Sequence, residues 1–381
     1  MRVVQATLML NRRSLLTAAA ATAALPASAW ARPGVDLNSL ILQERVPALG
    51  YAVVSSTAVK KIEVAGRRRL DRPDPVKADD AWHIGDNTMG LTAAVYARLV
   101  EAGKSSWGTK LSAIFPDVKL DAAFADATVE TLLAHRSGLE DVAVTTPDWL
   151  ARGHADTRTG RAQRKEEAAA LLTSPPTSKP GDFILARANY VVAGAALEAI
   201  AAADYEDLAK SEAFDWWGAT SAGFGPPLGD APWGHSHSAT GMFEPVAPGE
   251  FADYPRSMTA ATGAHLSLAE YARFVQLILS DGGGWLKPAS LARLARPYDH
   301  ATSGYGLGWR FIEEQGWAKG PVLTHQGSNT LWRTHVVIAP ARDLAVISVC
   351  NADAESACQR TIQLALKSFG EEAPAFNELK L

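Results

Sequence analysis

The placement of strand-like and helix-like patterns along the chain is the feature that most restricts its fold. Residues 49–56 and 61–70 are rich in apolar and β-branched side chains, which predicts a hairpin of two strands near the start. Further alternating runs predict antiparallel strands near the end, at residues 304–313, 321–326, 332–339 and 343–350. Because strands lie at both ends with helical patterns between them, we expect one antiparallel sheet completed by both ends of the chain.

The helical segments are predicted from apolar periodicity and from the residues that end each run. In residues 87–103, Leu91, Val95 and Leu99 recur every four positions, and Gly103 follows. The same criteria predict helices at residues 129–135, 166–173, 189–202, 204–213, 267–280, 288–296 and 354–369. The Pro- and Gly-rich residues 214–256 are expected to be irregular. The fold class is therefore α/β (α+β), with an α/β part at about 35–100 and 257–375 and a mostly helical insertion at about 101–256.

The first 31 residues have the order of an export signal. Arg12-Arg13 precede an apolar stretch from residue 15 to 25, and Ala29-Trp30-Ala31 offers a small-x-small cleavage site. Residues 11–16 also resemble a twin-arginine signal. We expect residues 1–31 to be removed, residues 32–381 to form the mature domain without a stable membrane span, and the protein to be periplasmic or secreted.

Charge and cysteine content exclude some classes of function. The formal net charge of −4 and the short basic runs do not indicate a nucleic-acid surface. Cys350 and Cys358 lack the paired spacing of a zinc site, and we favour two buried thiols over a disulfide. His235 and His237 form an H-x-H pair, for which a turn is favoured over a metal site. No metal and no cofactor is predicted.

Four segments in order resemble conserved motifs of one enzyme family. They are WHIGDNTMGLTAAVYARLVEAG at 82–103, TLLAHRSGL at 131–139, PGDFILARANYVVAG at 180–194 and THQGSNT at 324–330. Together they resemble the serine β-lactamase and penicillin-binding-protein family, which includes class C β-lactamases, DD-peptidases and related esterases. The resemblance runs from about residue 40 to 370 and implies that family's fold and serine acyl-transfer chemistry.

The residues at the family's catalytic positions differ from those the chemistry needs. The resemblance places the nucleophilic serine and lysine base of S-x-x-K at Asp86 and Met89. No S-x-x-K occurs anywhere in the sequence, and no G-x-S-x-G motif is present. Because methionine cannot accept a proton, this pair cannot carry out the family's nucleophilic attack.

The family's Tyr-x-Asn motif is also missing. Alignment on Tyr190 and Gly194 places its tyrosine and asparagine at Leu185 and Arg187, whereas alignment on Pro180-Gly181 places them at Ala186 and Ala188. The third family motif is retained as His325 and Gly327 around Gln326.

The substitutions predict a rearranged cluster. A partly buried aspartate needs a partner, so we predict an ion pair between Asp86 and Arg187, above a Met89–Leu185 contact. A plain helix N-cap for Asp86, alone or together with the pair, and a solvent-facing Arg187 are the alternatives.

The oxyanion hole depends on backbone groups, which survive changes of side chain. The resemblance assigns it to the N–H groups of Asp86 and Ser328, with the Asp86 carboxylate itself as a competing occupant. Three aromatic residues are candidates for apolar walls of the cleft, although ordinary packing is favoured for each: Tyr305, Trp309 and Trp332.

Other polar residues near these motifs are given structural roles. His135 and Ser137 belong to a motif that shapes the loop beside the site in the family. Glu140 and Asp141 are interpreted as a solvated turn. His325 is expected to be structural or to contact a ligand.

Three functions are compatible with this pattern. The favoured one is a catalytically inactive pseudoenzyme that binds a peptide, a cell-wall fragment or a protein partner. The second is an active hydrolase (esterase, β-lactamase or D-amino-acid peptidase type) with unusual chemistry at Asp86 and His325. The third is an interaction domain with a plugged cleft. Whether the protein is an enzyme stays open, with the missing catalytic residues weighing against serine acyl transfer.

Overall fold

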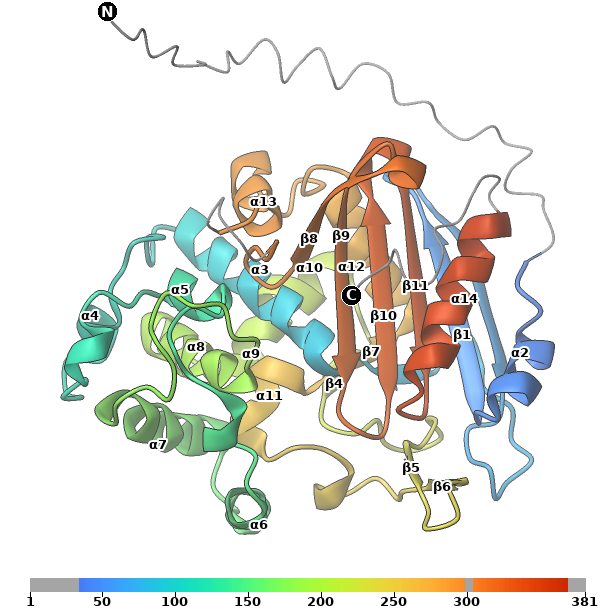
Figure 1. Cartoon of the computed structure of the whole chain (residues 1–381), viewed down its shortest axis with the longest axis horizontal. Helices are drawn as coiled ribbons and strands as arrows, with labels where there is room; N and C mark the ends of the chain where they lie inside the picture. The colour runs from blue at the N-terminus through green and yellow to red at the C-terminus, as the bar shows by residue number, and fades with distance from the viewer. Residues whose placement is uncertain (1–33, 299–303, 369–381) are drawn as a thin grey trace, which may run out of the picture.

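Both ends of the described chain contribute to one antiparallel sheet, as the sequence predicts. The computed structural model describes residues 34–298 and 304–368. Its six-stranded sheet has the order β2-β1-β11-β10-β9-β8 (Figure 1). The strands are β1 (Ala48–Val54), β2 (Val59–Gly66), β8 (Arg310–Gln315), β9 (Gly320–Ser328), β10 (Arg333–Ala339) and β11 (Leu344–Cys350). The N-terminal strand β1 lies directly beside the last strand, with Tyr51 opposite Ser348.

Helices cover both faces of the sheet. The first and last described helices, α2 (Leu37–Glu44) and α14 (Glu355–Ser368), pack on one face (Figure 1). On the other face lies α12 (Leu268–Leu279), whose capping box is formed by Ser267 and Glu270. Because β1 and β11 are buried along their whole length, these central strands are apolar on both faces rather than alternating.

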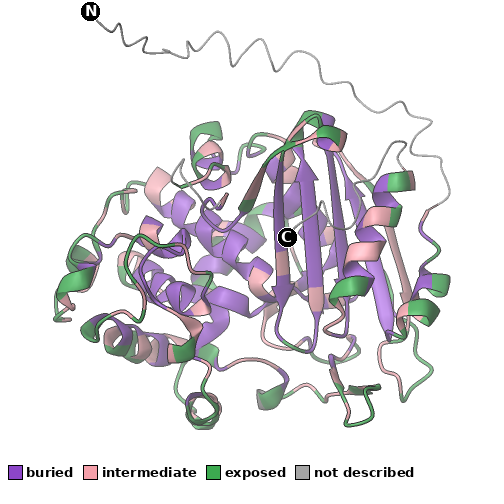
Figure 2. Cartoon of the chain, viewed as in Figure 1, coloured by how far each residue is buried: buried purple, intermediate pink, exposed green. Residues whose placement is uncertain are grey.

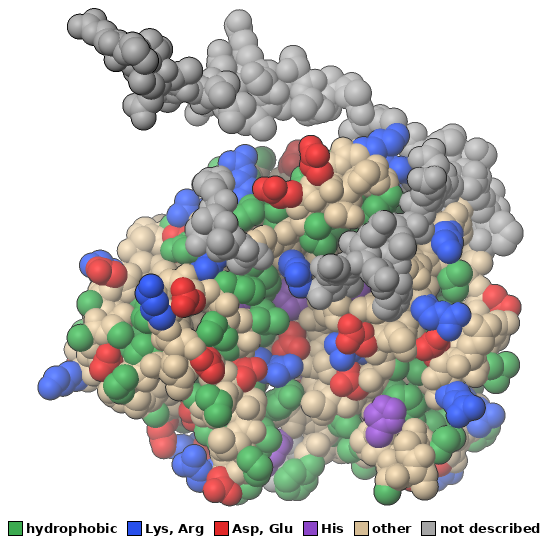
Figure 3. Space-filling view, in the orientation of Figure 1, with side chains coloured by type: hydrophobic (Ala, Val, Ile, Leu, Met, Phe, Trp, Pro, Cys, Tyr) green, Lys and Arg blue, Asp and Glu red, His purple; other side chains and the backbone are tan. Residues whose placement is uncertain are grey.

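A second group of helices packs beside the sheet around α3 (Thr88–Glu101), which is almost entirely buried (Figure 2). The other helices of eight or more residues are α6 (Pro147–Ala155), α7 (Gly160–Thr173), α8 (Arg187–Ala201) and α13 (Pro288–Ala295). Shorter helices are α4 (Leu111–Ile114), α5 (Val129–Leu133), α9 (Tyr205–Ala209), α10 (Asp215–Trp217) and α11 (Thr259–Thr262). Charged side chains of both signs are interspersed over the face drawn in Figure 3.

The structure corrects several boundaries. Strand β8 begins at Arg310 rather than 304, because Gly304 and Gly308 adopt positive φ and turn the chain before it. Helix α6, which sequence periodicity does not reveal, begins at Pro147 after a Thr146 cap. The segment expected to be irregular contains the short strands β4 (Gly223–Phe224), β5 (His235–His237) and β6 (Phe243–Pro245). Strand β4 joins β3 (Ala81–His83) and β7 (Ala264–Ser267) in a small sheet.

The predicted export signal lies outside the described residues. Among the residues that are described, no helix has the length and apolar character needed to cross a membrane. The division into an α/β part and a helical part remains a prediction.

Candidate functional site

The turn that carries Asp86 is held tightly against strand β9. Gly85 has φ +53°, and a Cβ at this position would lie 2.4 Å from the Ser328 nitrogen. The Gly85 N–H donates to His83 Nδ1 at 3.1 Å, so Nε2 of His83 carries the proton and donates to Asp253 at 2.9 Å. The Thr88 hydroxyl donates to the Gly85 carbonyl at 2.7 Å. These contacts fix where the short 3₁₀ turn Gly85–Asn87 presents Asp86.

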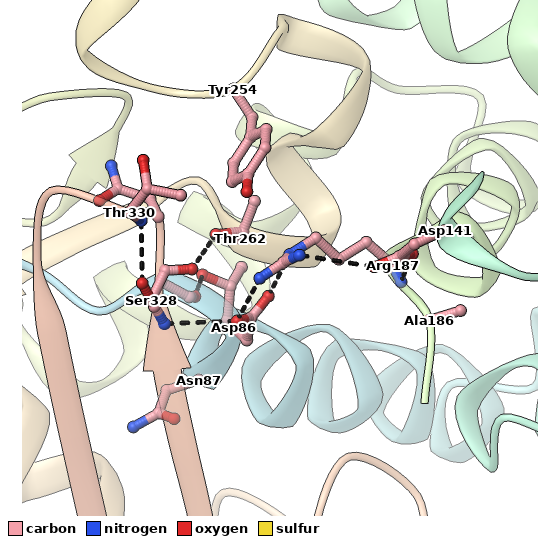
Figure 4. Close-up of polar contacts among 12 residues, drawn as sticks. Asp86, Asn87, Asp141, Ala186, Arg187, Tyr254, Thr262, Ser328 and Thr330 are labelled. Atoms are coloured by element: carbon pink, nitrogen blue, oxygen red, sulfur yellow. Dashed lines mark hydrogen bonds and ion pairs between the residues drawn. The ribbon is translucent and has the colours of Figure 1, made fainter. Parts of the chain in front are cut away.

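Asp86 and Arg187 form the ion pair that the sequence predicts. Arg187 Nε donates to Asp86 Oδ1 at 2.6 Å, and Nη2 donates to Oδ2 at 2.8 Å (Figure 4). The Asp86 and Arg187 side chains are only 16% and 21% exposed. Asp86 does not cap α3, whose N-terminus shows no side-chain cap bond. The carboxylate is therefore committed to the guanidinium, in the two-pronged geometry that gives the strongest such pairs.

Asp141 holds the other side of Arg187, which corrects the interpretation of Glu140 and Asp141 as a solvated turn. Asp141 Oδ1 accepts the backbone N–H groups of Arg187 and Ala188, and its Oδ2 lies 3.4 Å from Arg187 Nη1. Asp141 thus caps the start of α8, where Ala186 offers no side chain for capping. Burial raises the pKa of Asp141. Glu140 accepts a hydrogen bond from the Ser178 hydroxyl.

Tyr254 covers the same guanidinium. Arg187 Cζ lies 5.1 Å from the centre of the Tyr254 ring, within the range of a cation–π contact (Figure 4). Burial raises the pKa of Tyr254. Burial by itself lowers the pKa of Arg187. The charge and hydrogen bonds of the Asp86 carboxylate outweigh that effect, so the pKa of Arg187 is raised. Arg187 therefore stays charged and contacts Asp86, Asp141 and Tyr254 at once.

The Asp86 carboxylate also occupies the candidate oxyanion donor on β9. The Ser328 N–H donates to Asp86 Oδ2 at 3.3 Å. The Ser328 hydroxyl faces the other way and donates to Asp353 at 3.0 Å, while accepting the Thr330 N–H at 2.8 Å. A backbone donor that would stabilise a developing negative charge is thus already paired with a full negative charge.

The predicted Met89–Leu185 pair is wrong as a buried apolar contact. Met89 is 2% exposed and belongs to the main core cluster, whereas Leu185 is 59% exposed and lies outside that cluster. Leu185 precedes the α8 start that Asp141 caps, and the chain there runs along the surface. Met89, at the expected lysine position, therefore packs in the core, and Leu185, at one of the two expected tyrosine positions, lies outside the core cluster.

His325 is buried, and its hydrogen-bond partners are other residues than the pair. Its Nδ1 lies 2.9 Å from Asn87 Oδ1 and 2.8 Å from the Gln326 carbonyl, so Nδ1 carries the proton. Nε2 then accepts from the Tyr305 hydroxyl at 3.3 Å. Burial lowers the pKa of His325. Both ring nitrogens are engaged, and no hydrogen bond joins His325 to Asp86 among the described residues.

The remaining candidates occupy structural positions. Tyr305, Trp309 and Trp332 are buried at 4% exposure or less, in agreement with the packing interpretation. His135 contacts the rings of Phe183, Tyr190 and Tyr305, and its Nδ1 accepts the Ala186 N–H at 3.2 Å.

The H-x-H pair lies on strand β5 rather than in a turn. His235 is buried, accepts the Leu70 N–H at 3.2 Å on Nε2 and donates from Nδ1 to the Asn351 carbonyl at 2.8 Å. His237 is exposed and lies against Phe243, with ring centres 4.2 Å apart. The two imidazoles therefore belong to different environments.

The two cysteines are buried free thiols, as favoured from the sequence. Burial raises the pKa of both, that of Cys358 to about 12, which suppresses thiolate chemistry.

Comparison with known proteins agrees with the family resemblance. The family model described as Beta-lactamase matches residues 19–368. No curated protein sequence matches the chain.

Solved structures with the same fold are similar over most of the chain. The octameric penicillin-binding protein homologue from Pyrococcus abyssi is 19% identical, with a TM-score of 0.72 over 88% of this chain and 76% of that one. The D-alanine carboxypeptidase AmpC from Burkholderia cenocepacia is 17% identical, with a TM-score of 0.69 over 87% and 96%. SurE with D-Leu is 20% identical, with a TM-score of 0.66 over 89% and 76%.

Proposed function

The chain belongs to the β-lactamase family, and from this premise we propose that it is a non-hydrolytic member, exported to the periplasm or beyond, that binds a ligand without turnover. Its serine acyl-transfer centre is replaced by the Asp86–Arg187 pair. The S-x-x-K and Tyr-x-Asn positions carry Asp86, Met89, Leu185 and Arg187. Family membership describes ancestry and fold, whereas activity depends on the residues at the site.

The observation that carries the proposal is the set of contacts made by the Asp86 carboxylate. Oδ1 accepts from Arg187 Nε, while Oδ2 accepts from Arg187 Nη2 and from the Ser328 N–H. A carboxylate in a bidentate ion pair is a poor nucleophile, because attack requires its release from both donors. It also repels an oxyanion formed beside it.

A hydrolase that uses Asp86 with His325 is the competing function. Such an enzyme needs a base to activate the water that resolves the acyl-aspartate anhydride. His325 offers its only lone pair to Tyr305 and donates to Asn87 and Gln326, so its hydrogen bonds do not support that role.

An amino-acid or peptide ligand, including one from the cell wall, fits this proposal. SurE has been solved with D-Leu, which supports ligands of this class for the fold. Because an anionic group cannot share the Ser328 N–H with Asp86, the ligand must bind beside the pair. The alternative is an interaction domain that binds no ligand in its cleft. Binding measurements distinguish that alternative from the proposed function.

The test is turnover by the purified mature protein. A chromogenic cephalosporin and a short p-nitrophenyl ester are expected to be hydrolysed no faster than in buffer or with the Asp86→Ala variant. Turnover that disappears in Asp86→Ala would overturn the proposal and establish an aspartate-dependent hydrolase.

A further inference from the structure

A large open cavity adjoins the Asp86–Arg187 pair. It has a volume of about 710 Å³, within the range of pockets that hold small ligands. Tyr254 lines it and also covers the Arg187 guanidinium. Thr262 lines it too, and donates a 3.4 Å hydrogen bond to the Ser328 carbonyl. The cavity therefore ends against the rearranged site, while its other walls come from the α6–α7 connection, α9 and the chain after β4.

Most ionised side chains on the cavity wall are neutralised by a neighbour. Glu206 pairs with the buried Arg164 at 2.8 Å, and Asp204 pairs with Arg161 at 3.3 Å. Asp156 pairs with Arg158 at 2.6 Å. In the same way, Asp253 accepts from His83 and from the Asn329 amide. These carboxylates are used to hold the protein together.

Asp207 and Arg256 are the exceptions. Both line the cavity and are exposed, and neither side chain makes a hydrogen bond or ion pair with any described residue. One is a free carboxylate on α9, and the other is a free guanidinium just before α11. Two unpaired charges of opposite sign on one cavity complement a ligand that carries both an ammonium and a carboxylate.

The remaining lining is apolar enough to accept side chains between those charged ends. Phe224, Pro226, Pro255 and Met258 line the cavity, and Leu228 on the same wall is 73% exposed. Covering an exposed leucine side chain with an apolar ligand group removes apolar surface from water, which favours binding. Phe251 is 75% exposed, and its ring lies tilted against that of His154, another lining residue, with the ring centres 5.1 Å apart.

We propose that this cavity binds a short zwitterionic peptide with apolar side chains, with its ammonium at Asp207 and its carboxylate at Arg256. The inference deepens the proposed function, because it gives a non-hydrolytic protein a ligand site beside the closed catalytic centre. The inference can also be tested separately from the proposed function, because the cavity can bind a peptide whether or not Asp86 reacts.

The test compares Leu-Leu, N-acetyl-Leu-Leu and Leu-Leu amide by calorimetry or by NMR titration of the full mature protein. Leu-Leu is expected to bind about tenfold more tightly than either blocked form, the change for one charged hydrogen bond. Asp207→Asn is expected to abolish the advantage over N-acetyl-Leu-Leu but to keep that over the amide. Arg256→Gln is expected to do the reverse.

The exposed Asp117→Asn and Lys119→Gln variants, which lie outside the cavity lining, are the matched controls and should bind all three peptides normally. Three results would each overturn the inference. They are equal binding of the three peptides, an unchanged preference for Leu-Leu in both cavity variants, and no binding up to millimolar peptide. Hydrolysis of the p-nitrophenyl ester bears on the proposed function alone, so the two failures are distinguishable.

Discussion

Asp86 and Arg187, 101 residues apart in the chain, face one another through two parallel hydrogen bonds of 2.6 and 2.8 Å. The pair joins the turn before α3 to the first residue of α8, at the positions to which the sequence resemblance assigns the family's serine and asparagine. The two substitutions therefore make sense as a pair, since each charge needs the other at this burial.

Breaking this pair from either side should destabilise the fold. Asp86→Ala leaves the partly buried Arg187 with only its longer ion-pair contact to Asp141, and Arg187→Ala leaves Asp86 with only the Ser328 N–H. Each should therefore lower the free energy of unfolding by about 1–3 kcal/mol. The double variant that combines Asp86→Ala with Arg187→Ala should lose less than the sum of the single losses. Urea denaturation of the four proteins measures the coupling.

Asp156 and Arg158 provide a matched control because Arg158 is half exposed. Removal of that exposed pair should change the free energy of unfolding much less than either single variant at Asp86 or Arg187. Additive effects at Asp86 and Arg187 would contradict the coupling.

Gly85 should not accept a side chain. Alanine there meets the Ser328 backbone and must adopt a positive φ, so Gly85→Ala should cost at least about 2 kcal/mol. Gly103→Ala, with φ +71° and open space, isolates the backbone strain and should cost about 1–2 kcal/mol. Gly108→Ala has neither problem and should be neutral or slightly stabilising. Thermal unfolding of the three variants in parallel tests the order, and equal losses would refute the close contact.

Asp141 should act as the cap of α8. Asp141→Ala removes the acceptor for the Arg187 and Ala188 N–H groups, with an expected loss of about 1 kcal/mol. Thr146→Ala, which removes the cap of α6, is the comparison of the same type. Amide exchange at Ala188 should accelerate in Asp141→Ala but not in Thr146→Ala. Unchanged exchange at Ala188 would show that Asp141 is not the cap.

Buried histidines should make the fold sensitive to mild acid. Burial lowers the pKa of His135 from 6.5 to about 3. The unfolded chain then binds the extra proton, so stability falls as the pH drops below about 6.5 towards 3. Each such histidine contributes a slope of about 1.4 kcal/mol per pH unit.

His135→Gln should reduce that slope, whereas replacement of the exposed His237 by Gln should not. Urea denaturation between pH 7 and 5 measures both slopes. A slope in His135→Gln equal to that of the natural protein would contradict the assignment of His135 as a neutral buried ring.

The sequence predicts the main sheet because its strands carry strong local patterns. The first hairpin and the last four strands carry runs rich in apolar, β-branched or aromatic side chains, and all of them are found in one sheet. The strands of the small sheet are two to four residues long, which leaves too little pattern to detect. Helix α6 is similarly hidden, because only Trp149 of its residues is buried.

The part of the site that can be predicted from the sequence is the ion pair, because a partly buried charge needs a partner of opposite charge. A charge at position 86 implies a partner, and Arg187 is the residue that alignment brings to it. The position of Leu185 cannot be obtained this way, because an apolar residue next to a helix start can face either the core or the solvent. The role of Asp141 was also missed, because Asp141 lies 46 residues before Arg187 and only the fold brings its carboxylate to the start of α8.

The most direct test of the central claim is intact-protein mass after incubation with excess benzylpenicillin. We predict that the natural protein remains unmodified. The variant with Asp86→Ser, Met89→Lys and Arg187→Asn together is predicted to acquire one penicilloyl adduct, which would show that the scaffold still supports acylation once the pair is removed. A single adduct on the natural protein, absent from Asp86→Ala, would contradict the claim that the ion pair replaces the nucleophile.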